Sequence, residues 1–186
     1  MKNEFQQLIG DTRIMVATKK RGSIGNVFVR NKQLSISTTN NTNNVNNNQQ
    51  CNGPGCRQCP LSNEINMLTV NDIPVRIPQH LNCKSRHVIY MWVCKLCTWK
   101  NEVYFGRTTQ ECYDRTSGHR GCFSEEKFLK SALSMHAKDV HETDFNLDIF
   151  TISIVKKVSP QQLRREEFKF VEKYRTIPLG LNRYKV

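Results

Sequence analysis

The stretches His87-Val88-Ile89-Tyr90-Met91-Trp92-Val93 and Glu102-Val103-Tyr104-Phe105-Gly106-Arg107 decide the fold expected for this chain. Both are rich in β-branched and aromatic side chains, which favour strands. The short segment 95–101 joins them, so the two stretches predict an antiparallel hairpin.

Around this hairpin, the pattern predicts a third strand and three helices. Residues 145–155 alternate imperfectly between apolar and polar side chains, as a strand does. The helices are predicted over residues 109–120, 126–140 and 160–174. The last helix has Ser159 as its expected N-cap, Pro160 at its first position and Gln162 completing a capping box. The expected fold class is α+β, with a small three-stranded antiparallel sheet flanked by helices.

The composition divides the chain into four expected parts. These are a basic N-terminal segment (1–36), an Asn-rich linker (37–50), a cysteine-rich zinc-binding segment (51–86) and the α+β domain (87–186). The first part contains a possible strand at residues 27–29. The Asn-rich part is almost purely polar and cannot bury a core, which predicts disorder.

The charge of the chain indicates which class of partner it attracts. The formal net charge is +12, from 28 Lys+Arg against 16 Asp+Glu. Such a surface attracts polyanions, of which nucleic acid is the commonest; the alternative is a basic soluble protein without that partner. No apolar run reaches membrane-spanning length, and the N-terminus lacks the apolar core of a signal peptide. We therefore expect no membrane association and no secretion.

One carboxylate stands out in the last predicted helix. Glu167 falls on the apolar face between Leu163 and Phe170, where an unpaired carboxylate is costly unless it binds a metal. The alternative is a glutamate at the rim of the core that pairs with an arginine. Its neighbour Glu166 is expected on the solvent side.

Four further polar side chains have two interpretations each. Arg115 and His119 lie four residues apart and share one helical face, as either functional groups or solvated surface residues. Tyr90 and Tyr104 are either functional groups or ordinary aromatic strand residues. Together with Glu167 they supply a proton acceptor, a phosphate clamp and a metal ligand, which are the parts needed to cut a phosphodiester.

The chain contains eight cysteines, and their spacing predicts two zinc sites. Cytosolic or nuclear thiols favour metal over disulfides. The first expected ligand set is Cys51, Cys56, Cys59 and Cys83, and the second is Cys94, Cys97, His136 and His141. Cys112 and Cys122 are left over, and the alternative for any lone cysteine is a small buried apolar residue.

Residues 88–182 resemble the GIY-YIG endonuclease domain. Val88-Ile89-Tyr90 stands where that family has Gly-Ile-Tyr, and Tyr104-Phe105-Gly106 stands where it has Tyr-Ile-Gly. The family's later arginine, histidine, glutamate and asparagine are matched by Arg115, His119, Glu167 and Asn182. The first motif lacks its glycine.

The cysteine pattern is similar to the C-terminal endonuclease region of Penelope-like retroelements. Those elements carry a cysteine cluster like 51–60, a Cys-x-Ser like Cys83-Lys84-Ser85, a cysteine pair between the tyrosine motifs and two later histidines. Residues 19–30 resemble the segment that joins polymerase to nuclease there. The resemblance implies DNA as partner, a reverse transcriptase domain or element RNA as a possible further one, and a nuclear or else cytoplasmic location.

The resemblance also implies a mechanism, which is metal-dependent DNA strand cleavage by water. Tyr90 would accept a proton from the water, helped by His119 or the metal, if nearby positive charge favours its phenolate. Arg115 would hold the phosphate, and Glu167 would hold one Mg2+ or Mn2+. Tyr104 would position phosphate or water, and Asn182 would brace the site. The alternatives are a zinc-stabilised nucleic-acid-binding module without catalysis and an inactive retroelement remnant.

Overall fold

The computed structural model describes residues 49–51, 53–63, 65–97 and 102–183. The predicted basic segment, the possible strand at 27–29 and all but the end of the predicted linker lie outside this range. The strands are β1 (Met67–Val70), β2 (Ile73–Arg76), β3 (Val88–Cys94), β4 (Val103–Thr108) and β5 (Phe150–Lys157). The α-helices are α2 (Cys112–Arg120), α3 (Ala132–Val140), α4 (Leu163–Lys173) and the single turn α5 (Thr176–Leu179). Short 3-10 helices are η2 (Cys59–Leu61), η3 (Phe128–Lys130), η4 (Glu142–Asp144), η5 (Leu147–Ile149) and η6 (Pro160–Gln162).

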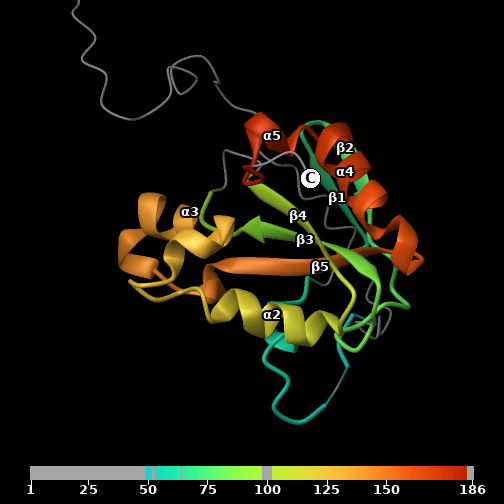
Figure 1. Cartoon of the computed structure of the whole chain (residues 1–186), viewed down its shortest axis with the longest axis horizontal. Helices are drawn as coiled ribbons and strands as arrows, with labels where there is room; N and C mark the ends of the chain where they lie inside the picture. Colours follow the sequence, from blue (N-terminus) through green and yellow to red (C-terminus); the bar gives the residue numbers. More distant parts are fainter. Residues whose placement is uncertain (1–48, 52, 64, 98–101, 184–186) are drawn as a thin grey trace, which may run out of the picture. The chain divides into compact units, whose positions relative to one another are not determined.

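The main sheet has three antiparallel strands in the order β4-β3-β5 (Figure 1). This confirms the predicted α+β class and the predicted hairpin. In the middle of the sheet Tyr90 pairs with Gly106 on one side and Ile154 on the other, next to a register shift at Ile89. The third strand begins at Phe150 rather than at 145, because the preceding residues form η5.

Alternation along β3 gives the sheet two buried faces. Tyr90 and Trp92 belong to one core with residues of α2 and α3, and Ile89 and Met91 belong to a second core with residues of α4. All four are fully buried. The sheet is therefore a middle layer, with α2 and α3 on one face and α4 on the other (Figure 1).

The strands β1 and β2 form a hairpin that the sequence analysis did not predict. Its two-residue loop is Asn71-Asp72, and both residues have positive φ (49° and 65°), as the tight turns of hairpins require. Val70 and Val75 pack into the α4 core. Segment 51–86 thus contributes to the same core as the residues after it.

The three predicted helices lie in the expected regions of the chain, but their first residues and the predicted cap differ. Ser159 makes no side-chain cap hydrogen bond, so the predicted capping box with Gln162 is absent, and η6 precedes the α-helix, which begins at Leu163. The helix predicted over 126–140 is η3 followed by α3, and the one predicted from 109 begins at Cys112. Among the described residues, no helix is both long and apolar enough to cross a bilayer.

Side-chain amides occupy both outer edges of the main sheet. The Asn182 carboxamide accepts from the Phe105 amide (2.9 Å) and donates to its carbonyl (2.8 Å) at the edge of β4. At the edge of β5, the Gln49 carboxamide accepts from the Ile154 amide (2.9 Å) and donates to the Ile154 carbonyl (2.8 Å). Gln49 is 1% exposed, so this end of the predicted linker belongs to the folded structure.

Candidate active site and metal clusters

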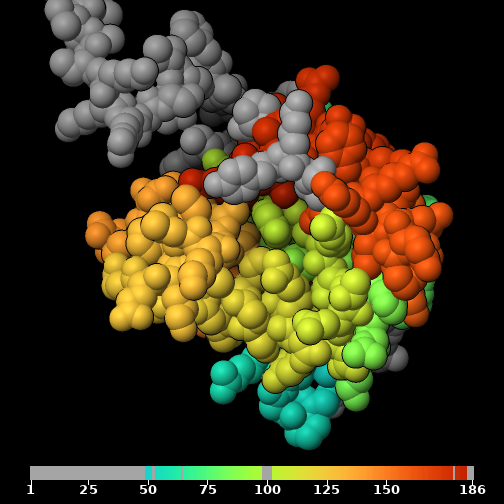
Figure 2. All heavy atoms as spheres, viewed as in Figure 1, coloured from blue at the N-terminus to red at the C-terminus, as the bar shows by residue number. Residues whose placement is uncertain are grey.

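A pocket of about 260 Å3 brings together most of the predicted polar residues. Its walls come from β4, α2, the η3–α3 segment, α4 and the C-terminal residues. In the space-filling view, orange atoms of α3 and red-orange atoms of α4 lie on either side of the yellow-green atoms of β4 and α2 (Figure 2). The predicted residues that line the pocket are Tyr104, Arg115, His119, Glu167 and Asn182.

Behind this pocket, Tyr90 is the centre of a hydrogen-bond network. Its hydroxyl accepts from Nε of Arg115 at 3.0 Å and lies 3.0 Å from Nε2 of His119. Nδ1 of His119 lies 3.2 Å from the hydroxyl of Ser131. Since β3, α2 and the residue before α3 supply these groups, packing of the helices on the sheet creates the network.

Donor and acceptor roles in this network follow from chemistry. Arginine can only donate, so the Tyr90 oxygen accepts there and its own proton is available for Nε2 of His119. Burial, with the charge of Arg115 adding to it, lowers the pKa of His119 to about 3, so the imidazole is neutral. If Tyr90 donates to Nε2, the single N–H of the neutral imidazole is at Nδ1 and donates to the Ser131 hydroxyl; the other tautomer reverses both hydrogen bonds.

Neither tyrosine is a phenolate at neutral pH. Burial holds the pKa of Tyr90 well above its ordinary value, and the nearby charge of Arg115 offsets only part of this. Burial likewise raises the pKa of Tyr104. The charge of Arg115 does favour the Tyr90 phenolate, as expected, but burial disfavours it more strongly, so the pKa is raised overall. Tyr90 also has no exposed surface, whereas Tyr104 is half-buried and borders the pocket.

Gly106 explains how the Tyr90 ring fits against β4. A Cβ atom at Gly106 would lie 2.6 Å from both the Cζ and the hydroxyl oxygen of Tyr90. Any larger residue would displace the hydroxyl from Arg115 and His119. The glycine of the second tyrosine motif is thus required by close approach of the ring rather than by backbone conformation.

Glu167 is buried on the pocket wall, and Arg107 is its partner. Nη1 of Arg107 lies 2.9 Å from Oε2 of Glu167, with side-chain exposures of 37% and 9%. Burial raises the pKa of this carboxyl, while the charges of Arg107 and Arg115 oppose the shift. Pairing with an arginine was the alternative to metal binding that the sequence left open for Glu167. The structure shows this pair, and the paired carboxylate lines the pocket.

Glu166 was predicted on the solvent side, and this is wrong. It is buried, and it forms ion pairs of 2.6 Å with both Lys156 and Lys169. Hydrogen bonds from these two lysines lower its pKa to about 2. Lys156 at the end of β5 draws the carboxylate toward the sheet, which helical periodicity alone does not reveal.

Asn182 has its carboxamide fully engaged. Besides both Phe105 backbone bonds, its oxygen accepts from the Thr176 hydroxyl at 2.8 Å. This arrangement fits the predicted bracing role and leaves the side chain poorly suited to bind a metal.

The first cysteine set forms a cluster that could hold a zinc ion. The sulfur atoms of Cys51, Cys56, Cys59 and Cys83 all lie within 4.8 Å of one another. The separations Cys51–Cys59 and Cys59–Cys83 are 3.7 and 3.4 Å. A tetrahedral site with Zn–S bonds of about 2.3 Å has sulfur atoms about 3.8 Å apart. These separations fit such a site; we call this set cluster 1.

The second set, called cluster 2, meets the same test. The ligand atoms of Cys94, Cys97, His136 and His141 lie within 4.8 Å of one another. Nε2 of His136 and of His141 lie 3.4 and 3.1 Å from the Cys97 sulfur. A tetrahedral zinc site places S and N ligands about 3.6 Å apart. Cluster 2 joins the end of β3 to α3.

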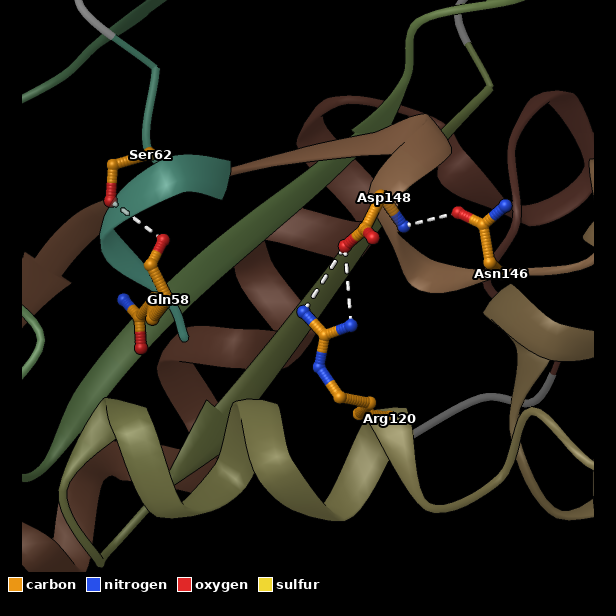
Figure 3. Close-up of polar contacts among 5 residues, drawn as sticks. All are labelled: Gln58, Ser62, Arg120, Asn146 and Asp148. Carbon is orange, nitrogen blue, oxygen red and sulfur yellow. Dashed lines mark hydrogen bonds and ion pairs between the residues drawn. The ribbon is translucent and has the colours of Figure 1, made fainter. Parts of the chain in front are cut away.

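Helix α2, which carries Arg115 and His119, is attached at both ends. The carbonyls of Cys83 and Ser85 accept from backbone amides in its first turn, at 2.9 and 3.0 Å, and so connect it to cluster 1. At the other end, Arg120 donates to Asp148 at 3.1 and 3.2 Å, and Asp148 is itself held by Asn146 (Figure 3).

Gln58 adds a third attachment for α2. It lies between two cluster 1 cysteines and is 1% exposed. Its backbone carbonyl accepts from Ser62 (Figure 3), and its side-chain oxygen accepts from the Thr116 hydroxyl at 3.1 Å. The cluster 1 loop thus contacts the helix one residue from Arg115.

Sequence reasoning missed Arg107, Ser131 and Gln58. Arg107 could have been found from its place in the second tyrosine strand, of which it is the next-to-last residue. Ser131 and Gln58 carry no sequence signal, because their partners lie 12 and 58 residues away. Comparison of the chain with protein-family models, curated proteins and solved structures finds no match.

Proposed function

We propose that the chain is a divalent-metal-dependent DNA endonuclease of the GIY-YIG type, similar to the nuclease region of Penelope-like retroelements. The observation that carries the proposal is the convergence of a tyrosine–arginine–histidine network and a buried carboxylate on one pocket. These groups come from β3, β4, α2 and α4, so no local sequence pattern forces them together.

Arg115 is the proposed phosphate ligand. It is exposed at the pocket, and its Nε bond to Tyr90 orients the guanidinium. A guanidinium offers further donors to phosphate oxygens and offsets charge that grows in the transition state. Lys130 and Arg183 also line the pocket and add positive charge for a DNA backbone.

Proton removal from the attacking water uses the two tyrosines in series. Tyr90 is sealed from the pocket, so Tyr104 is the group that meets the water. The Tyr104 ring lies beside that of Tyr90, with centroids 6.5 Å apart, and the charge of Arg115 acts on both hydroxyls. As the water oxygen bonds to phosphorus, its proton passes to Tyr104, the Tyr104 proton passes to Tyr90, and Tyr90 releases its own proton in the same step. The bond from phosphorus to the 3′ oxygen breaks, and that oxygen takes a proton from solvent.

Glu167 is the residue that would hold a catalytic Mg2+ or Mn2+. Its buried carboxylate faces the pocket, and a hard cation of this kind binds through one or two carboxylates together with waters and substrate phosphate. Such an ion would supply Lewis-acid stabilisation of the departing oxygen. Cluster 1 and cluster 2 are separate sites, each proposed to hold one structural zinc.

The second candidate function is a zinc-stabilised DNA-binding module without catalysis. The Glu167–Arg107 ion pair favours it, because it satisfies the buried carboxylate without a metal. It accounts for the clusters and the charge but gives no reason for the Tyr90 network. The two functions differ in whether a DNA backbone is cut after it is bound.

Plasmid nicking distinguishes these candidates. Wild-type protein should convert supercoiled plasmid to the open-circular form with Mg2+ or Mn2+, and Arg115→Ala should lose at least about a hundredfold in rate. Arg164→Ala is the matched control, since it removes an exposed guanidinium from α4 that does not line the pocket. DNA binding in a gel-shift assay without nicking under either metal would favour the second candidate.

A further inference from the structure

Two protonated tyrosines need an outlet for a proton. A phenol that already carries its proton can accept another only by giving one up in the same step. Apart from Tyr104, which supplies the proton, the described partners of the Tyr90 hydroxyl are Arg115, which only donates, and His119, whose Nε2 can accept at 3.0 Å. The proposed function therefore directs the proton from Tyr90 to His119.

His119 cannot keep that proton. Burial and the neighbouring Arg115 disfavour the imidazolium, so a proton gained at Nε2 must be matched by one lost at Nδ1. The partner of Nδ1 is the hydroxyl of Ser131, at 3.2 Å. Ser131 is 7% exposed and lines the pocket, so it connects the buried imidazole with solvent.

We propose that Ser131 is the outlet of a proton relay that runs from Tyr90 through His119 to water in the pocket. This inference rests on the proposed nuclease function and adds to it a residue and a direction of transfer. The Tyr90 proton passes to Nε2 of His119, the Nδ1 proton passes to the Ser131 oxygen, and the Ser131 proton passes to a pocket water. Each group exchanges one proton for another, so none is left charged.

The backbone around Ser131 holds its hydroxyl in place. The Ser131 carbonyl accepts from the Met135 amide and the Ser134 hydroxyl, both at 3.0 Å. Ser131 is also the residue before α3, which carries the cluster 2 ligand His136. Its hydroxyl makes no cap hydrogen bond to α3, so helix capping does not explain it.

The first test needs neither a variant nor activity. Nitrogen NMR shifts of the His119 side chain in the wild-type protein, at neutral pH and without DNA, should report the neutral tautomer protonated at Nδ1. A proton on Nε2, or an imidazolium, would overturn the relay even if the protein cuts DNA.

The second test uses variants in single-turnover nicking. Ser131→Ala should slow cleavage by about ten- to a hundredfold, less than the loss of a general base itself. DNA affinity, measured with Ca2+ in place of Mg2+, should stay unchanged, and Ser131→Thr should restore the rate because it restores the hydroxyl. Ser117→Ala is the control: its exposed hydroxyl donates to the Tyr113 carbonyl within α2 and contacts no group of the relay, so the rate should stay unchanged.

Failures of the two proposals can be told apart. A wild-type rate for Ser131→Ala refutes the relay and leaves the nuclease intact, and so does a loss that Ser131→Thr does not restore. A folded wild-type chain that cuts no DNA with any divalent metal refutes the nuclease and the relay together. If Ser131→Ala does not fold, the tautomer measurement alone tests the relay, and a proton on Nε2 refutes it.

Discussion

Glu167 and Arg107 allow a test in which one carboxylate has two competing partners. The change Glu167→Gln keeps the shape of the side chain and removes the charge that would attract a divalent metal. We expect plasmid nicking to fall by at least about a hundredfold, the scale of one lost transition-state interaction. The change Arg107→Gln instead removes the cation that lies 2.9 Å from the same carboxylate.

The expected size of the Arg107 effect follows from its exposure. Its side chain is 37% exposed, so solvent screens the pair and its contribution is at most about 1 kcal/mol. Freeing the carboxylate should therefore improve metal affinity by up to about fivefold. Arg107→Gln should reach half-maximal nicking at a correspondingly lower Mn2+ concentration.

The assay is nicking of supercoiled plasmid across a series of Mn2+ concentrations, with circular dichroism to check the fold. Lys169→Gln is a matched control, because it removes a 2.6 Å ion pair to Glu166 on the same helix without touching Glu167. Its metal requirement should equal that of the wild type. Full activity of folded Glu167→Gln, or an unchanged Mn2+ requirement in Arg107→Gln, would refute the reasoning.

Three further predictions concern metal, pH and DNA binding. Elemental analysis of protein purified under reducing conditions should find about two zinc ions per chain, and Cys94→Ser should remove one; a zinc-free chain that melts cooperatively would contradict this. Between pH 6.5 and about 3 the unfolded chain binds a proton at His119 that the folded chain excludes, so the unfolding free energy should fall as the pH drops through this range. His119→Gln should show a weaker fall in urea titrations, and an identical slope would contradict the pKa shift. Deletion of residues 1–35, which carry Lys19, Lys20 and Arg21, should weaken DNA binding and reduce its salt dependence. The melting temperature should stay unchanged. A large drop in melting temperature would contradict the view that this basic segment adds phosphate contacts without stabilising the domain.

The central hairpin and the residues of cluster 1 and cluster 2 could be predicted because their signals are local or chemically specific. Strands β3 and β4 are runs of seven and six residues that are rich in strong strand formers. Cys94 and Cys97, like Cys56 and Cys59, have the spacing that metal sites use. A few residue types therefore sufficed to anticipate which side chains would meet.

The features that could not be predicted depend on packing between distant segments. Strands β1 and β2 have only four residues each, and Pro74 weakens the strand signal. Tyr90 has no exposed surface because its ring lies directly against Gly106 and because α2 packs on the same face of the sheet. Sequence spacing gives the face of an element on which a side chain lies, but not how deeply its neighbours cover it.

The carboxamides of Gln49 and Asn182 protect the sheet against unwanted association. An outer strand normally presents unpaired amides and carbonyls on which another chain can form a β-ladder. At Ile154 and Phe105 these groups are already paired with a side chain that offers one donor and one acceptor. Together with the two lysines at the end of β5 and the register shift between β3 and β5, these pairings help a main sheet of three strands to remain small and resist growth into aggregates.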